Sequence, residues 1–387
     1  MKKILLVLAL FIGSTTLFAQ TSKKTTTTAP AISTIPKSLF DGLHWRNIGP
    51  FRAGRCIAVT GVYNNNQVYY AGAVGGGLWK TTDGGVDWHS VSDSTFGSAS
   101  VGAVEVAQTN PNVVYVGMGE VEMRGNISFG DGMYKSTDAG KSWKHIGLKE
   151  TYAIGSIAIH PQNENIVYVA AQGHNWGPNK ERGLYKTTDG GATWSLILKG
   201  YDDTTGCADV KIDPTNPNII YASMWKAFRT PYSLSSGGKG SGLYKSTDAG
   251  ATWKLISENP GMPKGLMGKI IVTISTVNNQ NLWAAVENID NAGIYSSNDG
   301  GETWSLNTQE NDLIQRPWYF SNLYVDPQNE NELYILSVEY WRSFDGGHEF
   351  SRAETNTWDN HVMWINPANP NNYIIGGDGG PTITFND

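Results

Sequence analysis

The sequence is poor in charged residues and almost free of cysteine. Asp, Glu, Lys and Arg make up 17% of its 387 residues, against about a quarter in an average soluble protein. There are two cysteines, the formal net charge is −6, and no basic block occurs. Because phosphate contacts dominate the affinity of proteins for nucleic acid, an acidic chain of this kind is not expected to bind it.

The motifs of metal and cofactor sites are also missing. The seven histidines form no HxH, HExxH or Cys/His cluster, which are spacings that hold transition metals. No glycine-rich nucleotide loop joins a strand to a helix, and no GxSxG nucleophile motif occurs. We therefore expect neither a cofactor nor a metal.

Long apolar runs are absent after residue 18, and a membrane span needs about 18 such residues or more. The apolar residues 4–18 follow two lysines and precede Ala19, a layout typical of a secretory signal peptide over residues 1–19. The threonine-rich residues 20–38 predict a flexible linker, and residues 39–387 the folded part. We expect export to the periplasm, the cell surface or the extracellular space, with no transmembrane segment in the mature chain.

Glycine, tryptophan and tyrosine are abundant, with 45, 14 and 18 copies, which favours many short strands joined by tight turns. One motif recurs along the chain. Its copies are GLWKTTDGGVDW (77–88), GMYKSTDAGKSW (132–143), GLYKTTDGGATW (183–194), GLYKSTDAGATW (242–253), GIYSSNDGGETW (293–304) and the degraded EYWRSFDGGHEF (339–350). A seventh copy runs from Pro381 to Asp387.

Local turn chemistry explains this motif. A Ser or Thr hydroxyl and an Asp carboxylate accept turn N–H groups, and the glycine two positions after the Asp provides a positive φ. The closing Trp begins the return strand and buries its ring. We therefore interpret the aspartates as structural. They are Asp83, Asp138, Asp189, Asp248, Asp299 and Asp345.

A turn rich in Pro and Asn, followed by a β-branched run, precedes each motif, as in residues 160–170. One unit is thus strand A, Pro/Asn turn, strand B, loop, strand C, Asp turn and strand D. Seven units predict an all-β, seven-bladed propeller of four-stranded antiparallel blades. Residues 44–49 match the return strand at 142–147, so we expect them to close the last blade. Cys56 and Cys207 fall in strands A of units one and four, too far apart for a disulfide.

The pattern SxDxGxTW resembles the Asp box, or BNR repeat, of sialidases, sortilin-type receptors and two-propeller xyloglucanases. The resemblance covers residues 44–387. Residues 126–143, 173–194 and 241–253 are more similar still to a group of large exported bacterial proteins labelled sortilin-like or BNR-repeat glycosyl hydrolases. Since these proteins are typically much longer, the resemblance also allows residues 39–387 to be the N-terminal part of a longer protein.

The catalytic motifs of these families are not matched in this sequence. The xyloglucanases have a catalytic Asp in an Asp-Val-Gly-Gly motif, and this chain has Ala73-Val74-Gly75-Gly76 at that place. Sialidases begin with Phe/Tyr-Arg-Ile-Pro and bind the substrate carboxylate with three arginines, but residues 51–54 read FRAG. No spacing brings the available arginines together. These are Arg124, Arg182, Arg229 and Arg316.

Propeller geometry places the B–C and D–A loops on the face opposite the Asp turns. Their Trp, Arg and carboxylate side chains suit sugar stacking or peptide capture. The predicted binding residues are Glu120, Arg124, His174, Trp176, Trp225, Arg229, Arg316, Trp318, Asp359, His361 and Asp378.

The loop residues are compatible with two functions from different classes. We favour a non-catalytic exported propeller that binds protein, peptide or glycan on this loop face. Trp176 and Trp318 have an alternative structural role, in which their rings fill gaps between blades. The alternative is a glycoside hydrolase that uses a pair of loop carboxylates on an extracellular polysaccharide. Its candidate acids are Asp378, Glu120 and Glu122.

Overall fold

The computed structural model describes residues 36–40, 42 and 54–387. The short 3-10 helix η1 (Lys37–Phe40) belongs to one unit, and all described strands belong to a second unit, residues 51–387. The predicted signal peptide, most of the predicted linker and the predicted strand at 44–49 lie outside the described residues. These three expectations therefore stay predictions.

The second unit contains seven antiparallel sheets in chain order. Blade 1 has β1 (Cys56–Val62), β2 (Asn65–Ala73), β3 (Gly77–Thr81) and β4 (His89–Ser90). Blade 2 has β5 (Val101–Val106), β6 (Val114–Met118), β7 (Met133–Ser136) and β8 (Lys144–His145). Blade 3 has β9 (Ile154–Ile159), β10 (Val167–Ala171), β11 (Gly183–Thr187) and β12 (Ser195–Lys199), preceded by the 3-10 helix η2 (Lys149–Thr151).

Blade 4 has β13 (Thr205–Ile212), β14 (Ile220–Thr230), β16 (Gly242–Ser246) and β17 (Lys254–Leu255), and β15 (Ser233–Ser236) pairs with the far end of β14. Blade 5 has β18 (Met267–Ile274), β19 (Leu282–Asn288), β20 (Gly293–Ser297) and β21 (Ser305–Thr308), followed by the 3-10 helix η3 (Asn311–Ile314). Blade 6 has β22 (Asn322–Val325), β23 (Leu333–Leu336), β24 (Tyr340–Ser343) and β25 (Ser351–Ala353). Blade 7 has β26 (Asn360–Ile365), β27 (Tyr373–Gly377) and β28 (Gly380–Thr384).

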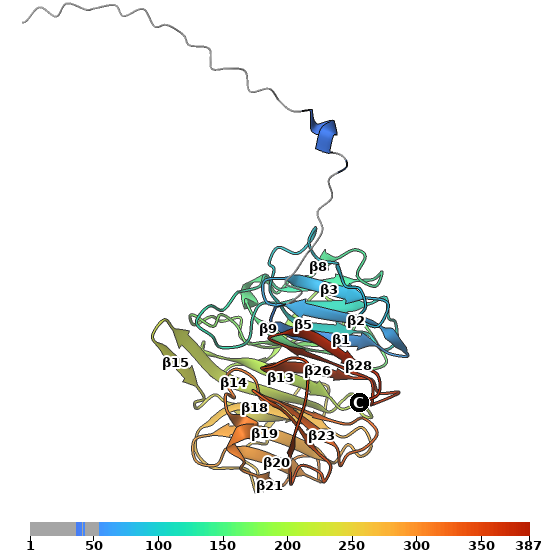
Figure 1. Cartoon of the computed structure of the whole chain (residues 1–387). Coiled ribbons are helices and arrows are strands. Elements are labelled where there is room, and N and C mark those ends of the chain that lie inside the picture. Colours follow the sequence, from blue (N-terminus) through green and yellow to red (C-terminus); the bar gives the residue numbers. More distant parts are fainter. Residues whose placement is uncertain (1–35, 41, 43–53) are drawn as a thin grey trace, which may run out of the picture. The chain divides into compact units, whose positions relative to one another are not determined.

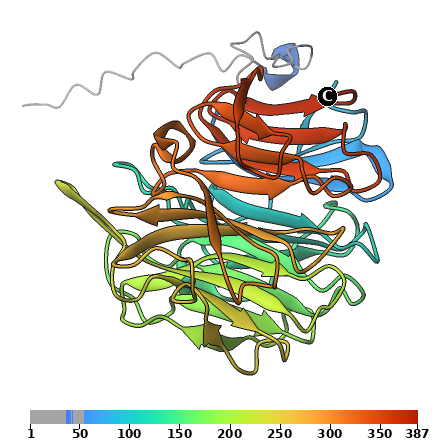
Figure 2. The same cartoon turned by 90° about the horizontal axis from the view of Figure 1, so that it is seen from below.

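The first strand of each blade contacts the first strand of the next, and β26 of the last blade packs on β1 of the first. Figure 1 shows β26 and β28 beside β1, and Figure 2 shows the first strands (blue) next to the last (red). This closed succession confirms the predicted seven-bladed, all-β propeller. The sheet of blade 7 has three strands among the described residues.

The Asp turns of blades 1 to 6 share two short hydrogen bonds, from a Ser or Thr hydroxyl to the Asp carboxylate and from the N–H of the glycine two positions after the Asp to that hydroxyl. In blade 4 the Ser246 hydroxyl donates to Asp248 Oδ1 at 2.8 Å and accepts from the N–H of Gly250, whose φ is +89°. Thr252 donates its N–H and its hydroxyl to the same carboxylate, at 2.8 and 2.6 Å. The hydroxyl bond of Thr252 is the largest cause that lowers the pKa of Asp248 to about 2. The carboxylate is thus fully occupied within its own turn.

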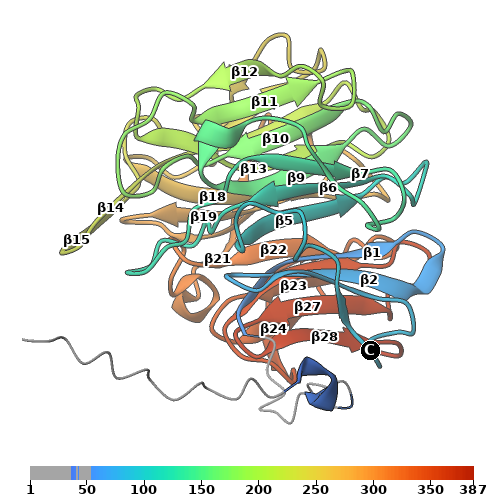
Figure 3. The same ribbon diagram turned by 90° about the horizontal axis from the view of Figure 1, so that it is seen from above.

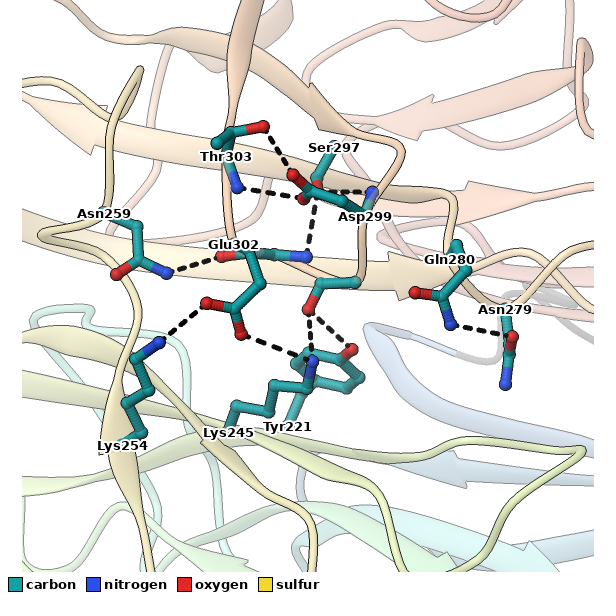
Figure 4. A network of polar contacts seen from close by, with 12 residues as sticks. Tyr221, Lys245, Lys254, Asn259, Asn279, Gln280, Ser297, Asp299, Glu302 and Thr303 are labelled. Atoms are coloured by element: carbon teal, nitrogen blue, oxygen red, sulfur yellow. Dashed lines mark hydrogen bonds and ion pairs between the residues drawn. The ribbon is translucent and has the colours of Figure 1, made fainter.

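The Asp turns also join neighbouring blades, as Figure 4 shows for blades 4 and 5. Lys245 Nζ and the Tyr221 hydroxyl of blade 4 both donate to the carbonyl of Gly300, at 2.6 and 3.2 Å. Glu302 of that turn pairs with Lys254 at 2.7 Å. The same Lys-to-carbonyl contact recurs between earlier blades, for example from Lys80 to Ala139 at 2.8 Å.

The inner strands carry both cysteines. Cys56 of β1 and Cys207 of β13 are free and buried, as predicted from their blades. Burial raises the pKa of the Cys56 thiol to about 12, so both behave as small apolar residues. Within the described part of the chain, no helix has the length and apolar character needed to cross a bilayer.

The antiparallel order places the A–B and C–D turns on one side of the ring and the B–C and D–A loops on the other. We call the second side the loop face. The β14–β15 hairpin extends beyond its blade (Figure 3), and Tyr232 at its tip is 90% exposed. The long β14 therefore carries Arg229 outward to the loop face.

Candidate functional site

A cavity of about 400 Å³ opens on the loop face. Six of the predicted binding residues line it: Arg124, Arg229, Arg316, Trp318, Asp359 and Asp378. Met123, Gly125 and Tyr319 are the other described residues that line it. The residues come from the loops after β6, η3, β25 and β27 and from the end of β14, so closure of the ring assembles this site from distant segments.

His361 lies beneath the cavity between two carboxylates and is 1% exposed. Its Nδ1 is 2.7 Å from Glu122 Oε1, and its Nε2 is 2.9 Å from Asp378 Oδ1. Burial alone would lower the pKa of the imidazole, but the charge of Glu122 and the hydrogen bond with Asp378 outweigh burial and raise it to about 9. His361 is therefore an imidazolium at neutral pH and fixes Asp378 at the cavity wall.

Glu120 and Glu122, the other candidate acids, do not line the cavity and are buried. Glu120 Oε2 accepts the N–H of Ser128 at 3.0 Å, and its Oε1 lies 3.6 Å from Arg55 Nε. Burial raises the pKa of Glu120 to about 7. Glu122 faces the narrow central channel of about 160 Å³. These two acids hold Arg55 and His361 in place and are out of reach of a ligand in the cavity.

Among the residues that the structure describes, Asp359 and Asp378 are the two carboxylates that line the cavity. Asp359 has a φ of +45°, a left-handed conformation that Asp tolerates better than most residues. Its carboxylate lies 3.7 Å from Arg316 Nη1. Burial, and then the charge of Asp378, raises the pKa of Asp359. The N–H of Asp378 donates to the Trp358 carbonyl at 2.9 Å, which joins the two acid-bearing loops.

The glycines around Asp378 permit this close approach. A Cβ on Gly377 would lie 2.5 Å from Thr357 Oγ1, and one on Gly379 would lie 3.0 Å from the same oxygen. The Gly379 N–H donates to that hydroxyl at 3.1 Å. The loop that carries Thr357 therefore lies close against the backbone on both sides of Asp378.

Aromatic and guanidinium groups form the remaining walls. Trp318 is half-buried, and its ring lies 5.9 Å from that of Tyr319. The Tyr319 hydroxyl accepts from Arg124 at 3.2 Å and from Arg55 at 3.3 Å. Sequence reasoning missed Arg55, which has no motif around it, since its role depends on two buried acids from another blade.

The structure leaves the other predicted residues outside the cavity. Trp225 is 1% exposed and packs in the core beside Met123, and its Nε1 donates to Ser236 at 3.1 Å. His174 and Trp176 line a separate small pocket that also includes Glu120. Of the four arginines considered for a triad, Arg182 is buried elsewhere. Its guanidinium donates to the carbonyls of Gln172, His174, Gly177, Thr204 and Ala227.

The chain is similar to known proteins in sequence and in fold. The profile described as "Sortilin, neurotensin receptor 3", of the Sortilin-Vps10 family, matches residues 76–226 and 131–264. Xyloglucanase Xgh74A of Acetivibrio thermocellus is 26% identical over 342 residues, which cover 78% of this chain and 38% of that protein. A Paenibacillus xyloglucanase is 22% identical and is covered over 32% of its length. The chain thus spans about a third of the length of these curated relatives.

Solved structures show the same fold. The GH74 xyloglucanase of Xanthomonas campestris aligns with a TM-score of 0.62 at 16% identity, over 87% of this chain and 53% of that chain. The protein YCF48 bound to D1 peptide aligns with a TM-score of 0.56 at 15% identity, over 89% of this chain and 98% of that chain. The family profile, these relatives and the fold show that this chain is a propeller similar to sortilin-like, BNR-repeat proteins and to the xyloglucanase group of glycoside hydrolases.

Proposed function

We propose that this chain is a glycoside hydrolase-like propeller that cleaves a polysaccharide in the loop-face cavity. One observation carries the proposal: Asp359 and Asp378 line the same cavity, and the charge of Asp378 helps raise the pKa of Asp359. The names of the relatives favour this hydrolase interpretation over the non-catalytic one that the sequence alone suggested.

The two acids have different surroundings, as glycosidase chemistry requires. The raised pKa of Asp359 suits the general acid, which gives its proton to the glycosidic oxygen as the C–O bond breaks. Asp378 pairs with the imidazolium of His361 and acts as the anionic partner, either attacking the anomeric carbon or taking a proton from water. Trp318 provides an aromatic face for the sugar ring.

Release of reducing sugar from xyloglucan and from a polysaccharide panel tests the proposal. We expect Asp359→Asn and Asp378→Asn each to lower the rate by at least about 100-fold, the usual contribution of a general acid or base. Asp290→Asn is a matched control, since Asp290 is exposed in the loop after β19 and does not line the cavity. Two variants with unchanged turnover and unchanged melting temperature would contradict these roles.

A second function is favoured by one specific residue. Ala73 ends β2 and is 6% exposed, and it stands where the xyloglucanases that the sequence resembles have a catalytic Asp. If that position is the catalytic one, this chain lacks the acid needed there, and the loop-face cavity binds its ligand without cleaving it. Retention of a polysaccharide by the purified protein, without any release of reducing sugar, would identify this case.

A further inference from the structure

We propose that the loop-face cavity recognises a carboxylate-bearing sugar, a uronate unit of an acidic polysaccharide. The polysaccharide nature of the ligand rests on the proposed function, while the charge argument rests on the cavity itself. Three guanidinium groups surround this cavity: Arg124 follows β6, Arg229 lies near the end of β14, and Arg316 follows η3. Closure of the ring brings them together.

Two of these guanidiniums have only neutral partners. Within residues 54–387, neither Arg124 nor Arg229 has a carboxylate oxygen within 4.0 Å; Arg124 donates to the Tyr319 hydroxyl at 3.2 Å, and Arg229 donates to the Met123 carbonyl at 3.4 Å. The Nε of Arg229 is buried and has no hydrogen-bond partner in the described part of the chain. Of the three arginines, Arg316 alone pairs with a carboxylate of the described residues, Asp359. Since a guanidinium stays charged and matches a carboxylate in two-pronged geometry, an anionic ligand group would complete both sites.

The cavity remains open and positive at these groups. Gly125 has no side chain to cover Arg229, and a Cβ built there would lie 3.7 Å from Nη2. Among the described residues, three guanidiniums and two carboxyl groups line the cavity, so its charged side chains are net positive even when both acids are ionised. Both carboxylates already have cationic partners, Arg316 for Asp359 and His361 for Asp378. They leave Arg124 and Arg229 for the ligand.

The remaining lining favours a sugar as the carrier of the carboxylate. Trp318 is half-buried beside Tyr319 and offers a face for ring stacking. The carboxylates of Asp359 and Asp378 accept hydrogen bonds from hydroxyl groups, and they would repel a doubly charged phosphate. A uronate combines one negative charge with several hydroxyls, which fits all three features.

Calorimetric titration with uronate oligosaccharides tests the inference. The probes are oligogalacturonate, an alginate oligomer, and the carboxyl-reduced form of each, which keeps the linkage and loses the charge. We expect at least one charged oligomer to bind at least tenfold more tightly than its reduced form, and added salt to weaken this binding. Arg124→Gln and Arg229→Gln should each weaken it at least tenfold. Arg352→Gln is the control, because Arg352 is exposed on β25, pairs with Glu339 and does not line the cavity.

The possible results separate this inference from the proposed function. Equal binding of charged and reduced oligomers, or no binding of either, overturns the inference; cleavage of neutral xyloglucan in the same samples would leave the proposed function standing. Arginine-dependent binding of uronates without cleavage supports the inference and removes the catalytic part of the proposed function. Capture of a peptide with a free C-terminal carboxylate, while uronates fail to bind, overturns the inference in favour of a peptide ligand.

Discussion

His361 shows how a single side chain depends on its surroundings. Its imidazole contacts Glu122 and Asp378, and these acids raise its pKa from 6.5 to about 9 in the folded protein. Because the folded pKa is above the unfolded one, the stabilisation is fully present below about pH 6.5 and is lost as the pH rises through about 9. The charged form of this residue therefore stabilises the fold at neutral pH and not in alkaline solution.

The pH dependence of His361→Gln tests this interpretation. At pH 7 we expect the variant to lose about 1–3 kcal/mol of the free energy of unfolding, because Glu122 stays buried without its cation. At pH 10 the difference between wild type and variant should shrink. Thermal unfolding of both proteins from pH 6 to 10 measures it, and a difference that is constant with pH would show that His361 is neutral in the fold.

Asp189 serves as the test case for the structural role of the aspartates in the Asp turns. Its carboxylate accepts from the N–H of Thr193 at 2.9 Å and from the Thr187 hydroxyl at 2.7 Å. Asp189→Ala removes the carboxylate that accepts both bonds, so we expect a lower melting temperature. Ligand binding should not change, since the turn lies on the side opposite the loop face. Asp290→Ala is the matched control on an exposed acid. A variant that unfolds normally and loses binding would assign these aspartates a direct functional role.

Among the strands and turns, a few polar groups of one blade form hydrogen bonds with the Asp turn of the next blade. Tyr221 on β14 and Lys245 on β16 share one acceptor, the carbonyl of Gly300 in the next blade (Figure 4). Blade 4 thus binds the turn of blade 5, in addition to the apolar cluster between them. Unfolding of one blade should therefore destabilise the next.

Tyr221→Phe measures one such contact. We expect a loss of about 1 kcal/mol in the free energy of unfolding, since the hydrogen bond is removed while Lys245 still satisfies the carbonyl. Tyr232→Phe, at the exposed hairpin tip, should change nothing. Denaturant unfolding of the two variants compares them directly, and equal stabilities would mean that the Tyr221 hydroxyl contributes nothing across the interface.

For the whole molecule, stability depends on how the last blade closes the ring. Among the described residues β28 is the outermost strand of blade 7, and the segment at 44–49 is predicted to add the fourth. Deletion of residues 40–50 should then lower the melting temperature or cause aggregation, because it exposes the edge of β28. Deletion of residues 21–35 serves as the control. Identical thermal unfolding of the two truncated proteins would argue against closure by the N-terminal segment.

The order of the strands made the side of the ring on which each loop lies predictable, but not the burial of its side chains. Loop residues such as Arg316 and Asp378 were assigned to one face from the order of strands alone, and the structure brings both to one cavity. Glu120, Trp225 and His361 were assigned to the same face, yet all three are buried. Strand order determines the side of the ring on which a loop lies, whereas burial depends on what the neighbouring blades place against it.

The sequence by itself determined the repeating unit, the number of blades, the bonding pattern of the turns and the free state of both cysteines. The Asp turns depend on contacts within about four residues, as between Asp248 and Thr252, so a local motif carries them completely. The tertiary structure alone decided that Asp359 and Asp378 share a cavity, that His361 is charged and that three arginines converge. Asp359 and Asp378 lie on two loops of blade 7, which a backbone hydrogen bond holds together. The contact of His361 with Glu122 and the convergence of the arginines need residues from blades far apart in the chain, and only closure of the ring brings these within reach of one another.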